Sequence, residues 1–254
     1  MRNLHLELFA VPEIPKIYPG DDLVSLIASA MDRSNLKLFD GDVLIIAQKI
    51  VSKAEGRSVC LNDVKPSSEA RKLAKLTDKN PSIVELIIRE SEEIIRHRPG
   101  IIIAKHKSGW ILANAGIDQS NVTDNPNDVL LLPKNPNQSA ANLRSCFLER
   151  FKVKTGVIIA DSVGRPWRVG TTGIALGSAG VDALVNLRGR SDLFGRILEV
   201  SEHGVADSIA SAAELLLGEA DEAIPVVILR GMNEGKSKQD ARVLLRPDKE
   251  NMFR

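Results

Sequence analysis

The residues that could bind a divalent cation lie in two short stretches of the chain. The first, residues 114–121, gathers the Asp118 carboxylate, the Ser120 hydroxyl and several carboxamides around Gly116, after an apolar run that predicts a strand. Such oxygen-rich loops suit Mg²⁺ or Mn²⁺ and polar ligands. A turn in which these side chains cap only their own backbone is the alternative interpretation.

The second stretch, residues 158–168, gives the sharpest local signal. An apolar strand is predicted to present Asp161 and Ser162 at its carboxyl end, and a glycine turn then exposes Arg165 and Arg168. A carboxylate beside a hydroxyl commonly holds a hydrated metal near phosphates, and arginines can clamp an anionic substrate. A structural turn capped by Asp161 remains the alternative.

Lys53 follows the apolar run 43–51, in the sequence Ser52-Lys53-Ala54-Glu55-Gly56. We expect it where a strand opens into a turn, which is a good place for a phosphate-binding ammonium. A solvated lysine after a strand is the alternative. No GxxxxGK[ST] motif occurs in the chain, so a Walker-type phosphate loop is excluded.

Three acids, Glu219, Asp221 and Glu222, follow a predicted helix that ends near residue 217. The carboxyl end of a helix disfavours anions, so acids gathered there are locally costly unless a cation or solvent offsets the repulsion. A metal ligand at Glu219 and a solvated acidic loop are both compatible with this pattern.

Other common chemistries are not supported by the motifs. The glycine-rich stretch 170–180 matches a dinucleotide-binding fingerprint only loosely, because the strand, helix and downstream acid are out of register. The four histidines show no HExxH or other zinc-ligand spacing, and no GxSxG motif marks a serine nucleophile.

Strand and helix patterns interleave along the chain. Short runs rich in Val and Ile predict strands at residues 43–51, 101–105, 110–113, 129–132, 157–160 and 224–229. Helical patterns cover residues 67–76, 82–96, 140–151 and 206–217. In the second of these, Ser82 is the expected N-cap, with Glu85 three residues on, and Gly218 is the expected C-cap of the last.

This alternation predicts a mixed α/β to α+β protein with mixed β-sheets, whose strand order the sequence does not determine. The 254 residues are enough for one catalytic unit with a substantial core. The polar stretch 123–140, which contains three prolines, is the expected connection between two lobes. The charged segment after Gly235 is expected to be loosely held.

Composition limits the partners and the compartment. Lys and Arg number 34 against 33 Asp and Glu, and this net charge of +1 gives no reason to expect nucleic acid or an anionic membrane. Cys60 and Cys146 lie in unrelated contexts, and no apolar run approaches the ~20 residues of a spanning helix. We therefore expect a soluble protein in a reducing cytoplasm.

Four separated motifs together resemble the coenzyme F-420-0:γ-glutamyl ligase family. They lie, in order, at residues 51–56, 114–121, 161–165 and 218–219, and the resemblance extends from Pro15 to Gly231. The segment 164–168 is most similar to the bacterial branch, in which the ligase is often fused to a flavin-binding domain. The resemblance here covers the ligase domain alone.

Carried over by position, the resemblance implies that Asp118 and Asp161 hold one divalent cation, Mn²⁺ or Mg²⁺. Ser162 and Glu219 would help to hold a second, and Lys53 would join Asp118 and Asp161 in the catalytic set. The resemblance also implies K⁺. Archaeal members tend to carry Thr at the Ser162 position, where Ser also supplies a hydroxyl.

The resemblance further implies a GTP site. Lys53 and Asn121 would contact the nucleotide, and the loop Ile14-Pro15-Lys16-Ile17 would surround its base. The residues after the last predicted helix would line the same nucleotide: Leu217, Gly218, Ala220 and Asp221. Gln48 and Lys49 stand where archaeal members tend to carry Ser and Thr.

The implied activity is a GTP-dependent ligation of L-glutamate to coenzyme F-420-0 through an acyl phosphate, with release of GDP and phosphate. The resemblance also implies a homodimer with its active site near the subunit contact. Two other classes stay open at this point. One is a metal-dependent nucleotide hydrolase or phosphotransferase with another acceptor, and the other is a non-catalytic nucleotide-binding paralogue.

Overall fold

Five strands form the main sheet of this computed structural model, which describes residues 5–232, 235 and 238–252. In order across the sheet they are β1 (Glu7–Ala10), β12 (Val226–Arg230), β2 (Val43–Ala47), β8 (Gly156–Gly164) and β9 (Thr171–Ala179). Strands β2 and β8 run parallel, and the other neighbouring pairs are antiparallel. The predicted α+β class with mixed sheets is therefore confirmed.

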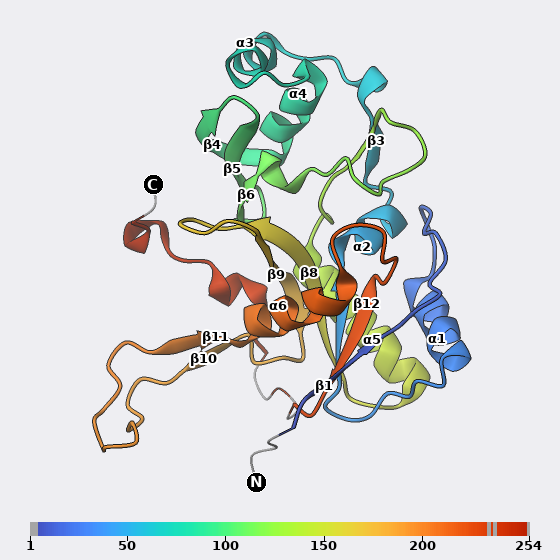
Figure 1. Ribbon diagram of the computed structural model, residues 1–254, viewed down its shortest axis with the longest axis vertical. Helices are drawn as coiled ribbons and strands as arrows, with labels where there is room; N and C mark the ends of the chain where they lie inside the picture. Colours follow the sequence, from blue (N-terminus) through green and yellow to red (C-terminus); the bar gives the residue numbers. More distant parts are fainter. Residues whose placement is uncertain (1–4, 233–234, 236–237, 253–254) are drawn as a thin grey trace.

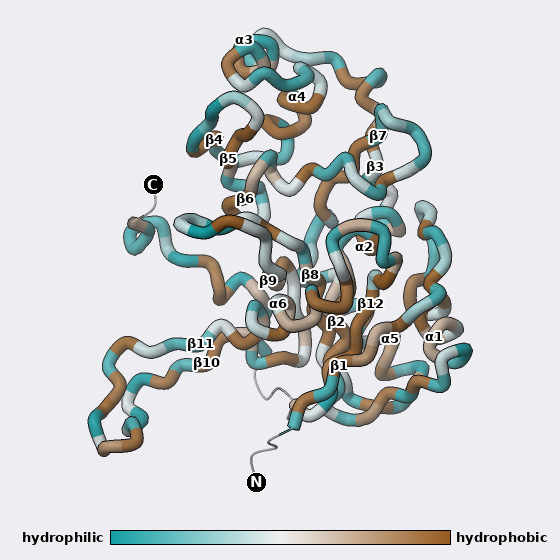
Figure 2. The backbone as a smooth tube through the Cα atoms, viewed as in Figure 1, coloured by the Kyte–Doolittle hydropathy of each residue, from teal (hydrophilic) through white to brown (hydrophobic). Residues whose placement is uncertain are grey.

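Helices cover both faces of this sheet (Figure 1). On one face lie α1 (Leu23–Arg33), α2 (Gln48–Ala54) and α5 (Pro136–Phe151), and on the other lies α6 (Val205–Leu217). Successive side chains of a strand point to opposite faces. Leu44 and Ile46 accordingly join the core beneath α1, α2 and α5, whereas Val43 and Ile45 join the core beneath α6. Figure 2 shows the hydrophobic stretches of β2 and β12 enclosed by these layers.

The chain between β2 and β8 also builds two smaller sheets, beside which α3 and α4 lie (Figure 1). Strand β3 (Ser58–Cys60) pairs with β7 (Asp128–Leu130), and β4 (Ser91–Arg98), β5 (Ile101–His106) and β6 (Ile111–Ala113) form a three-stranded sheet. Helices α3 (Ser68–Thr77) and α4 (Pro81–Glu90) share a separate apolar core with β5. The stretch 123–140 contains β7 and the start of α5, and its role as a connection between two lobes stays a prediction.

A hairpin arm, residues 184–204, projects from the body of the molecule (Figure 1). Its strands are β10 (Leu184–Asn186) and β11 (Glu202–Gly204). After β12, short 3₁₀ helices occupy Ala241–Leu244 and Asp248–Glu250. Ala241 is fully buried in the core beneath α6, so the prediction of a loosely held segment is wrong there. Residues 236–237 lie outside the described residues.

The predicted strand at residues 43–51 is wrong in its second half, where α2 begins at Gln48. Ile50 and Val51 are buried against the core beneath α1 and α5, as strand residues would be. A short β-branched run does not distinguish a buried strand from a buried helix, so the sequence pattern was ambiguous. Lys53 consequently lies in the last turn of a helix rather than in a turn after a strand.

The predicted helix at residues 82–96 is also too long. Helix α4 ends at Glu90, and the residues that follow form β4, which pairs with β5. Ile94 and Ile95 continued the helical spacing by coincidence, since both are partly buried in the strand. The N-cap of the helix lies two residues earlier than predicted, because the side chain of Asn80, not that of Ser82, accepts the capping hydrogen bond at 2.8 Å.

The glycine-rich stretch 170–180 forms β9, which the sequence analysis did not predict as a strand. Two of its glycines let helices approach the sheet closely. A Cβ on Gly173 would lie 2.5 Å from the Ala210 carbonyl oxygen in α6, and one on Gly177 would lie 2.3 Å from the Pro136 carbonyl in α5. The glycines therefore serve packing, which agrees with the rejection of a dinucleotide fingerprint.

Among the described residues, none of the helices combines the length and the apolar character needed to cross a bilayer. The predictions for α3, α5 and α6 hold within a few residues at each end, and the strands predicted near residues 101, 110, 129, 157 and 224 correspond to β5, β6, β7, β8 and β12. Gly218 ends α6 with a φ of 71°, as expected of a C-cap glycine.

Glu85 ties α3 to α4. Its carboxylate accepts the Ser67 backbone N–H at 2.8 Å, beside the N-terminus of α3, and also accepts the Arg89 guanidinium at 2.8 Å. The hydrogen bonds from Ser67 are the main reason that the pKa of Glu85 falls from 4.5 to about 2. A depressed pKa means that this stabilisation is fully present above pH 4.5 and is lost as the pH falls towards 2.

We therefore expect Glu85→Gln to lower the free energy of unfolding at pH 7 by ~1–2 kcal/mol, because a neutral amide accepts the Ser67 hydrogen bond more weakly. The difference from wild type should shrink between pH 4.5 and pH 2. Urea denaturation monitored by circular dichroism measures both effects. Glu149→Gln, an exposed change on α5, is the control and should show neither. If Glu85→Gln lowered the free energy of unfolding by the same amount at every pH, the stabilising role of the ionised Glu85 carboxylate would be contradicted.

Candidate active site

The candidate site lies where the parallel pair of strands ends. Ala47 of β2 stands opposite Ala160 of β8, so the chain enters α2 at the same edge where β8 presents Asp161 and Ser162. Carboxyl ends of neighbouring parallel strands are common positions for ligand sites in sheets with helices on both faces. This edge is the only one in the described main sheet that two parallel strands share.

Two loops bring the other predicted residues to this edge. Asp118 is fixed by a pair of backbone hydrogen bonds with Leu130, at 3.0 and 2.8 Å. The loop after α6 is joined to β8 by the Ser162 hydroxyl, which donates to the Glu219 carboxylate at 3.0 Å. The structure thus brings together Asp118, Asp161, Ser162 and Glu219 from three separate parts of the chain.

Lys53, Asn121 and the loop after α6 are linked directly. The Lys53 ammonium donates to the Asn121 carbonyl oxygen at 2.7 Å, and the Asn121 amide donates to the Ala220 carbonyl oxygen at 2.7 Å. Asn121 has a φ of 54°, a left-handed conformation that Asn tolerates better than most residues. Burial, followed by the nearby ammonium groups of Lys49 and Lys16, lowers the pKa of Lys53.

Asp118 is held by a lysine that the sequence analysis did not place in the site. The Lys49 ammonium in α2 lies 2.7 Å from one Asp118 oxygen, and both side chains are about three-quarters buried, with exposed fractions of 26% and 30%. The other Asp118 oxygen accepts the backbone N–H and the hydroxyl of Ser120, each at 2.8 Å. Although burial alone would raise the pKa of Asp118, these hydrogen bonds lower it.

Of Asp118, Asp161 and Glu219, Asp161 is the one whose surroundings disfavour a charged carboxylate most. Burial raises its pKa to about 7, and the negative charges of Asp118 and Glu219 contribute to the same shift. The Lys49 ammonium opposes the shift only in part. Carboxylates that repel one another in a partly buried place are typical of sites whose charge is completed by a ligand cation.

Glu219 belongs to a second acidic group. Its two oxygens accept the Ser162 hydroxyl at 3.0 Å and the Thr171 hydroxyl at 2.9 Å. Glu214 of α6 lies beside it, and burial together with the contact to Glu219 raises the pKa of Glu214 to about 7. The hydrogen bond with Glu214 lowers the pKa of Glu219, so Glu214 is the member of this pair that binds a proton more readily.

The remaining predicted residues surround this centre. In the loop between β1 and α1, Ile14 is partly buried, Pro15 and Lys16 are exposed, and Ile17 is buried. Lys16 forms an exposed ion pair with Asp124 at 3.3 Å. Leu217 is the last residue of α6, Gly218 caps the helix, and Asp221 is exposed on the following loop. Arg165 and Arg168 lie in the exposed turn between β8 and β9.

The donor set suits a hard divalent cation, since it consists of carboxylate and hydroxyl oxygens whose negative charges outnumber the positive charges beside them. In the described residues, however, no group of three or more His, Cys, Asp or Glu side chains is arranged to hold a metal ion as it stands. The ammonium of Lys49, at hydrogen-bonding distance from Asp118, partly neutralises the carboxylates. The metal ligands named from the sequence therefore stay a prediction.

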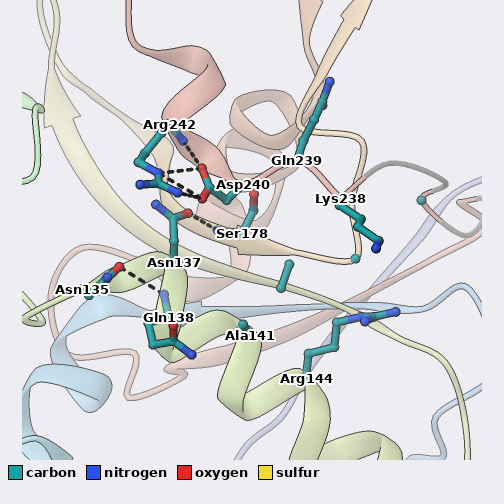
Figure 3. Close-up of a pocket in the computed structure, with 13 residues that line it drawn as sticks. Asn135, Asn137, Gln138, Ala141, Arg144, Ser178, Lys238, Gln239, Asp240 and Arg242 are labelled. Carbon is teal, nitrogen blue, oxygen red and sulfur yellow. Dashed lines mark hydrogen bonds and ion pairs between the residues drawn. The ribbon is translucent and has the colours of Figure 1, made fainter.

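A polar cavity of about 480 Å³ lies elsewhere, between the start of α5, the end of β9 and the segment 238–242 (Figure 3). Its lining includes Asn137, Arg144, Ser178 and Arg242, and none of the predicted site residues. Ser178 stands opposite Ile158, three residues before Asp161 on β8 and so ~10 Å away along the strand. The cavity is separate from the acidic edge.

Residues 12–231 match the family described as F420-0:Gamma-glutamyl ligase, and the chain belongs to this family. The coenzyme F420:L-glutamate ligase of Methanopyrus kandleri is 44% identical over 255 residues, which cover 98% of each chain. The protein of the same name from Methanothermobacter thermautotrophicus is 43% identical, over 98% of this chain and 99% of its own. The family predicted from the four motifs is confirmed, while the likeness of segment 164–168 to the bacterial branch stays a prediction.

Four residues near the site were missed by the sequence analysis: Lys49, Asp124, Thr171 and Glu214. Lys49 had a usable signal, since it precedes Lys53 by four residues and would share its face on a helix. The strand predicted for this stretch concealed that relation. Thr171 and Glu214 gave no local signal, because their contacts join elements that are distant in sequence.

The strain on Asp161 predicts a change in stability. Because the pKa of Asp161 is raised, its contribution to the free energy of unfolding is greatest below pH 3.8. This contribution is lost as the pH rises through about 7. At pH 8 and without added metal, the free energy of unfolding of Asp161→Asn should therefore be ~1–3 kcal/mol larger than that of wild type, so the variant is the more stable protein. The gain should disappear near pH 4.

Urea denaturation in the presence of a chelator, at pH 4, 6 and 8, measures this difference. Asp221→Asn, which removes an exposed carboxylate from the loop after α6, is the matched control and should change little at any of these pH values. If Asp161→Asn were less stable than wild type at pH 8, the repulsion among these carboxylates would not be the dominant force on Asp161.

Proposed function

We propose that this protein joins L-glutamate through its amine to the carboxylate of coenzyme F-420-0, and joins any further glutamate through a γ-glutamyl amide bond, with GTP as co-substrate. One observation carries the proposal: Asp118, Asp161, Ser162 and Glu219 converge with the Lys53 ammonium at one edge of the sheet. The relatives named coenzyme F420:L-glutamate ligase, matched over almost their whole length, support the same activity.

Formation of an amide from a carboxylate in water is uphill, so the reaction needs an activated acyl group. In the proposed first step, an oxygen of the F-420-0 carboxylate attacks the γ-phosphorus of GTP. The bond to the β,γ-bridging oxygen breaks, which yields an acyl phosphate and GDP. The glutamate amine then attacks the acyl carbon, phosphate leaves, and the nitrogen loses a proton to give the amide.

In this proposal Asp118 and Asp161 would hold one divalent cation, Mn²⁺ or Mg²⁺, and Ser162 and Glu219 a second. When bound, these cations would neutralise the triphosphate and the charge that develops during phosphoryl transfer. The unrelieved repulsion around Asp161 supports such a site. The implied K⁺ has no residue assigned to it and stays a prediction, as do the cytoplasmic location and the absence of a nucleic acid partner.

Lys53 would supply a fixed positive charge to the phosphates. Its ammonium is held by the Asn121 carbonyl oxygen at 2.7 Å, so little reorganisation is required when an anion arrives. Its partial burial strengthens the attraction, because the surroundings screen the charge less than bulk water does. No covalent protein nucleophile is needed for either step.

The base of GTP would lie against the loop of residues 14–17. The side chains of this loop contain no acid that could accept the guanine N1 and N2 hydrogens, so main-chain carbonyls would read the base. Asp124 lies next to the loop through its ion pair with Lys16 at 3.3 Å. Leu217, Gly218, Ala220 and Asp221 would line the same nucleotide from the loop after α6.

Incubation of the protein with F-420-0, GTP, Mn²⁺ and L-glutamate, followed by mass spectrometry, tests the proposed function. We expect a product heavier by one or more glutamyl residues, and GDP release that depends on glutamate. Asp161→Asn and Asp118→Asn should each abolish turnover, with strongly non-additive effects in the double variant, because both would act on one cation.

Glutamate-independent release of GDP without a heavier product would instead support a nucleotide hydrolase or a phosphotransferase with another acceptor. Nucleotide binding without any turnover would indicate a non-catalytic paralogue. Full activity in a folded Asp161→Asn protein would remove Asp161 from the proposed cation site.

We also propose that the protein is a homodimer and that the hairpin arm contacts the second copy. Four large apolar side chains of the arm are each more than half exposed: Leu193, Phe194, Ile197 and Val200. Figure 2 shows hydrophobic segments along this projecting arm. Apolar side chains gathered on a projecting element commonly mark an interface between proteins.

Leu193→Asp should convert the dimer to a monomer, because it would bury an unpaired charge in the interface. Light scattering coupled to size-exclusion chromatography measures the mass. Leu215→Asp, which changes another exposed leucine, on α6, is the matched control and should remain dimeric. A monomeric wild-type protein, or a dimeric Leu193→Asp variant, would contradict the proposed interface.

A further inference from the structure

Lys49 is the residue of the site whose position the proposed chemistry does not explain. Its ammonium lies 2.7 Å from an Asp118 oxygen and 2.9 Å from the Ser120 hydroxyl, with the Ser120 carbonyl oxygen at 3.4 Å. Three oxygen partners around one cation resemble the oxygen environment that a hard metal ion selects. The partners are those of the loop that is proposed to bind metal.

Both oxygens of Asp118 are occupied in this arrangement. One faces Lys49, and the other accepts the backbone N–H and hydroxyl of Ser120. A cation that coordinated the first oxygen would have to displace the ammonium, since two positive charges would otherwise lie within a few ångströms of each other. Lys49 and a metal ion are therefore alternatives at Asp118.

The influence of Lys49 extends to the other acids of the site. Its positive charge favours the ionised forms of Asp118 and Glu219, and it opposes in part the upward shift in the pKa of Asp161. A single ammonium on α2 therefore acts on carboxylates from three separate segments. Lys53, one helical turn along α2, donates instead to the Asn121 carbonyl oxygen at 2.7 Å.

We propose that Lys49 is a resident stand-in for the divalent cation, which holds the carboxylates together in the metal-free protein and must withdraw when the metal binds. The inference rests on the proposed function, because it requires a metal site at Asp118. Lys49 is in this sense a positioning residue, since it acts through Asp118.

Displacement of Lys49 would couple the binding of the metal to the binding of the nucleotide. A metal alone would displace the ammonium from the Asp118 carboxylate and leave it beside a dication. A nucleotide triphosphate would supply new anionic partners for the displaced side chain, which reaches solvent on a flexible four-carbon stem. Metal and nucleotide should therefore bind with positive coupling, and the coupling should depend on Lys49.

Titration of the full-length protein with Mn²⁺, followed by electron paramagnetic resonance of the free ion, tests the proposal without reference to activity. Lys49→Met should lower the Kd of Mn²⁺ in the absence of nucleotide by about tenfold or more, because a competing unit charge is removed from the site. A non-hydrolysable GTP analogue should strengthen Mn²⁺ binding by a larger factor in wild type than in Lys49→Met.

Two further variants make the test specific. Lys49→Arg keeps the charge and should bind Mn²⁺ as weakly as wild type, whereas Lys49→Gln removes the charge but keeps a hydrogen-bond donor and should behave as Lys49→Met. Lys75→Met, in the last turn of α3, is the control for loss of a lysine outside the site. Circular dichroism confirms that each variant is folded, and Lys49→Gln replaces Lys49→Met if that variant does not fold.

The outcomes separate the two claims. Unchanged or weaker Mn²⁺ binding in both neutral variants, while wild type binds measurably, would overturn the role of Lys49 and leave the proposed metal site intact. Failure of wild type to bind Mn²⁺ even with the nucleotide analogue would overturn the proposed metal site, and the inference with it.

Discussion

Mutual repulsion among carboxylates is the constraint on which the site depends. Asp118, Asp161 and Glu219 come from three segments, and burial makes their like charges more costly than they would be in water. Each is restrained separately: Asp118 by its backbone pairing with Leu130, Asp161 by its place in β8, and Glu219 by two hydroxyl donors. The fold thus holds together groups that would separate in a flexible chain.

The layers of the molecule supply this restraint. Strands β2 and β8 are buried between helices on both faces, and their parallel pairing sends α2 and Asp161 to the same edge. Close approach of α6 to Gly173 sets the position from which the loop containing Glu219 departs. A larger residue at Gly173 would move α6 and disturb a contact far from the substitution, so packing and site geometry are coupled.

The sequence singled out residues that converge at one edge of the sheet, but it misassigned some of the elements that carry them. Asp161 was visible because a clear apolar strand precedes it, and Asp118 because a loop concentrates oxygen ligands around it. The helix at Gln48–Ala54 and the strand at Ser91–Arg98 were missed, since short β-branched runs suit either structure until tertiary packing decides. The Lys49 to Asp118 pair joins residues 69 positions apart, which no local pattern specifies.

Anomalous X-ray scattering from crystals grown with Mn²⁺ and a non-hydrolysable GTP analogue tests the central claim most directly, namely that this carboxylate edge is a cation site. The account predicts a manganese peak coordinated by Asp118 and Asp161, with the Lys49 ammonium displaced from Asp118. Manganese bound only by other residues, with the Lys49 to Asp118 ion pair intact beside the bound nucleotide, would contradict it.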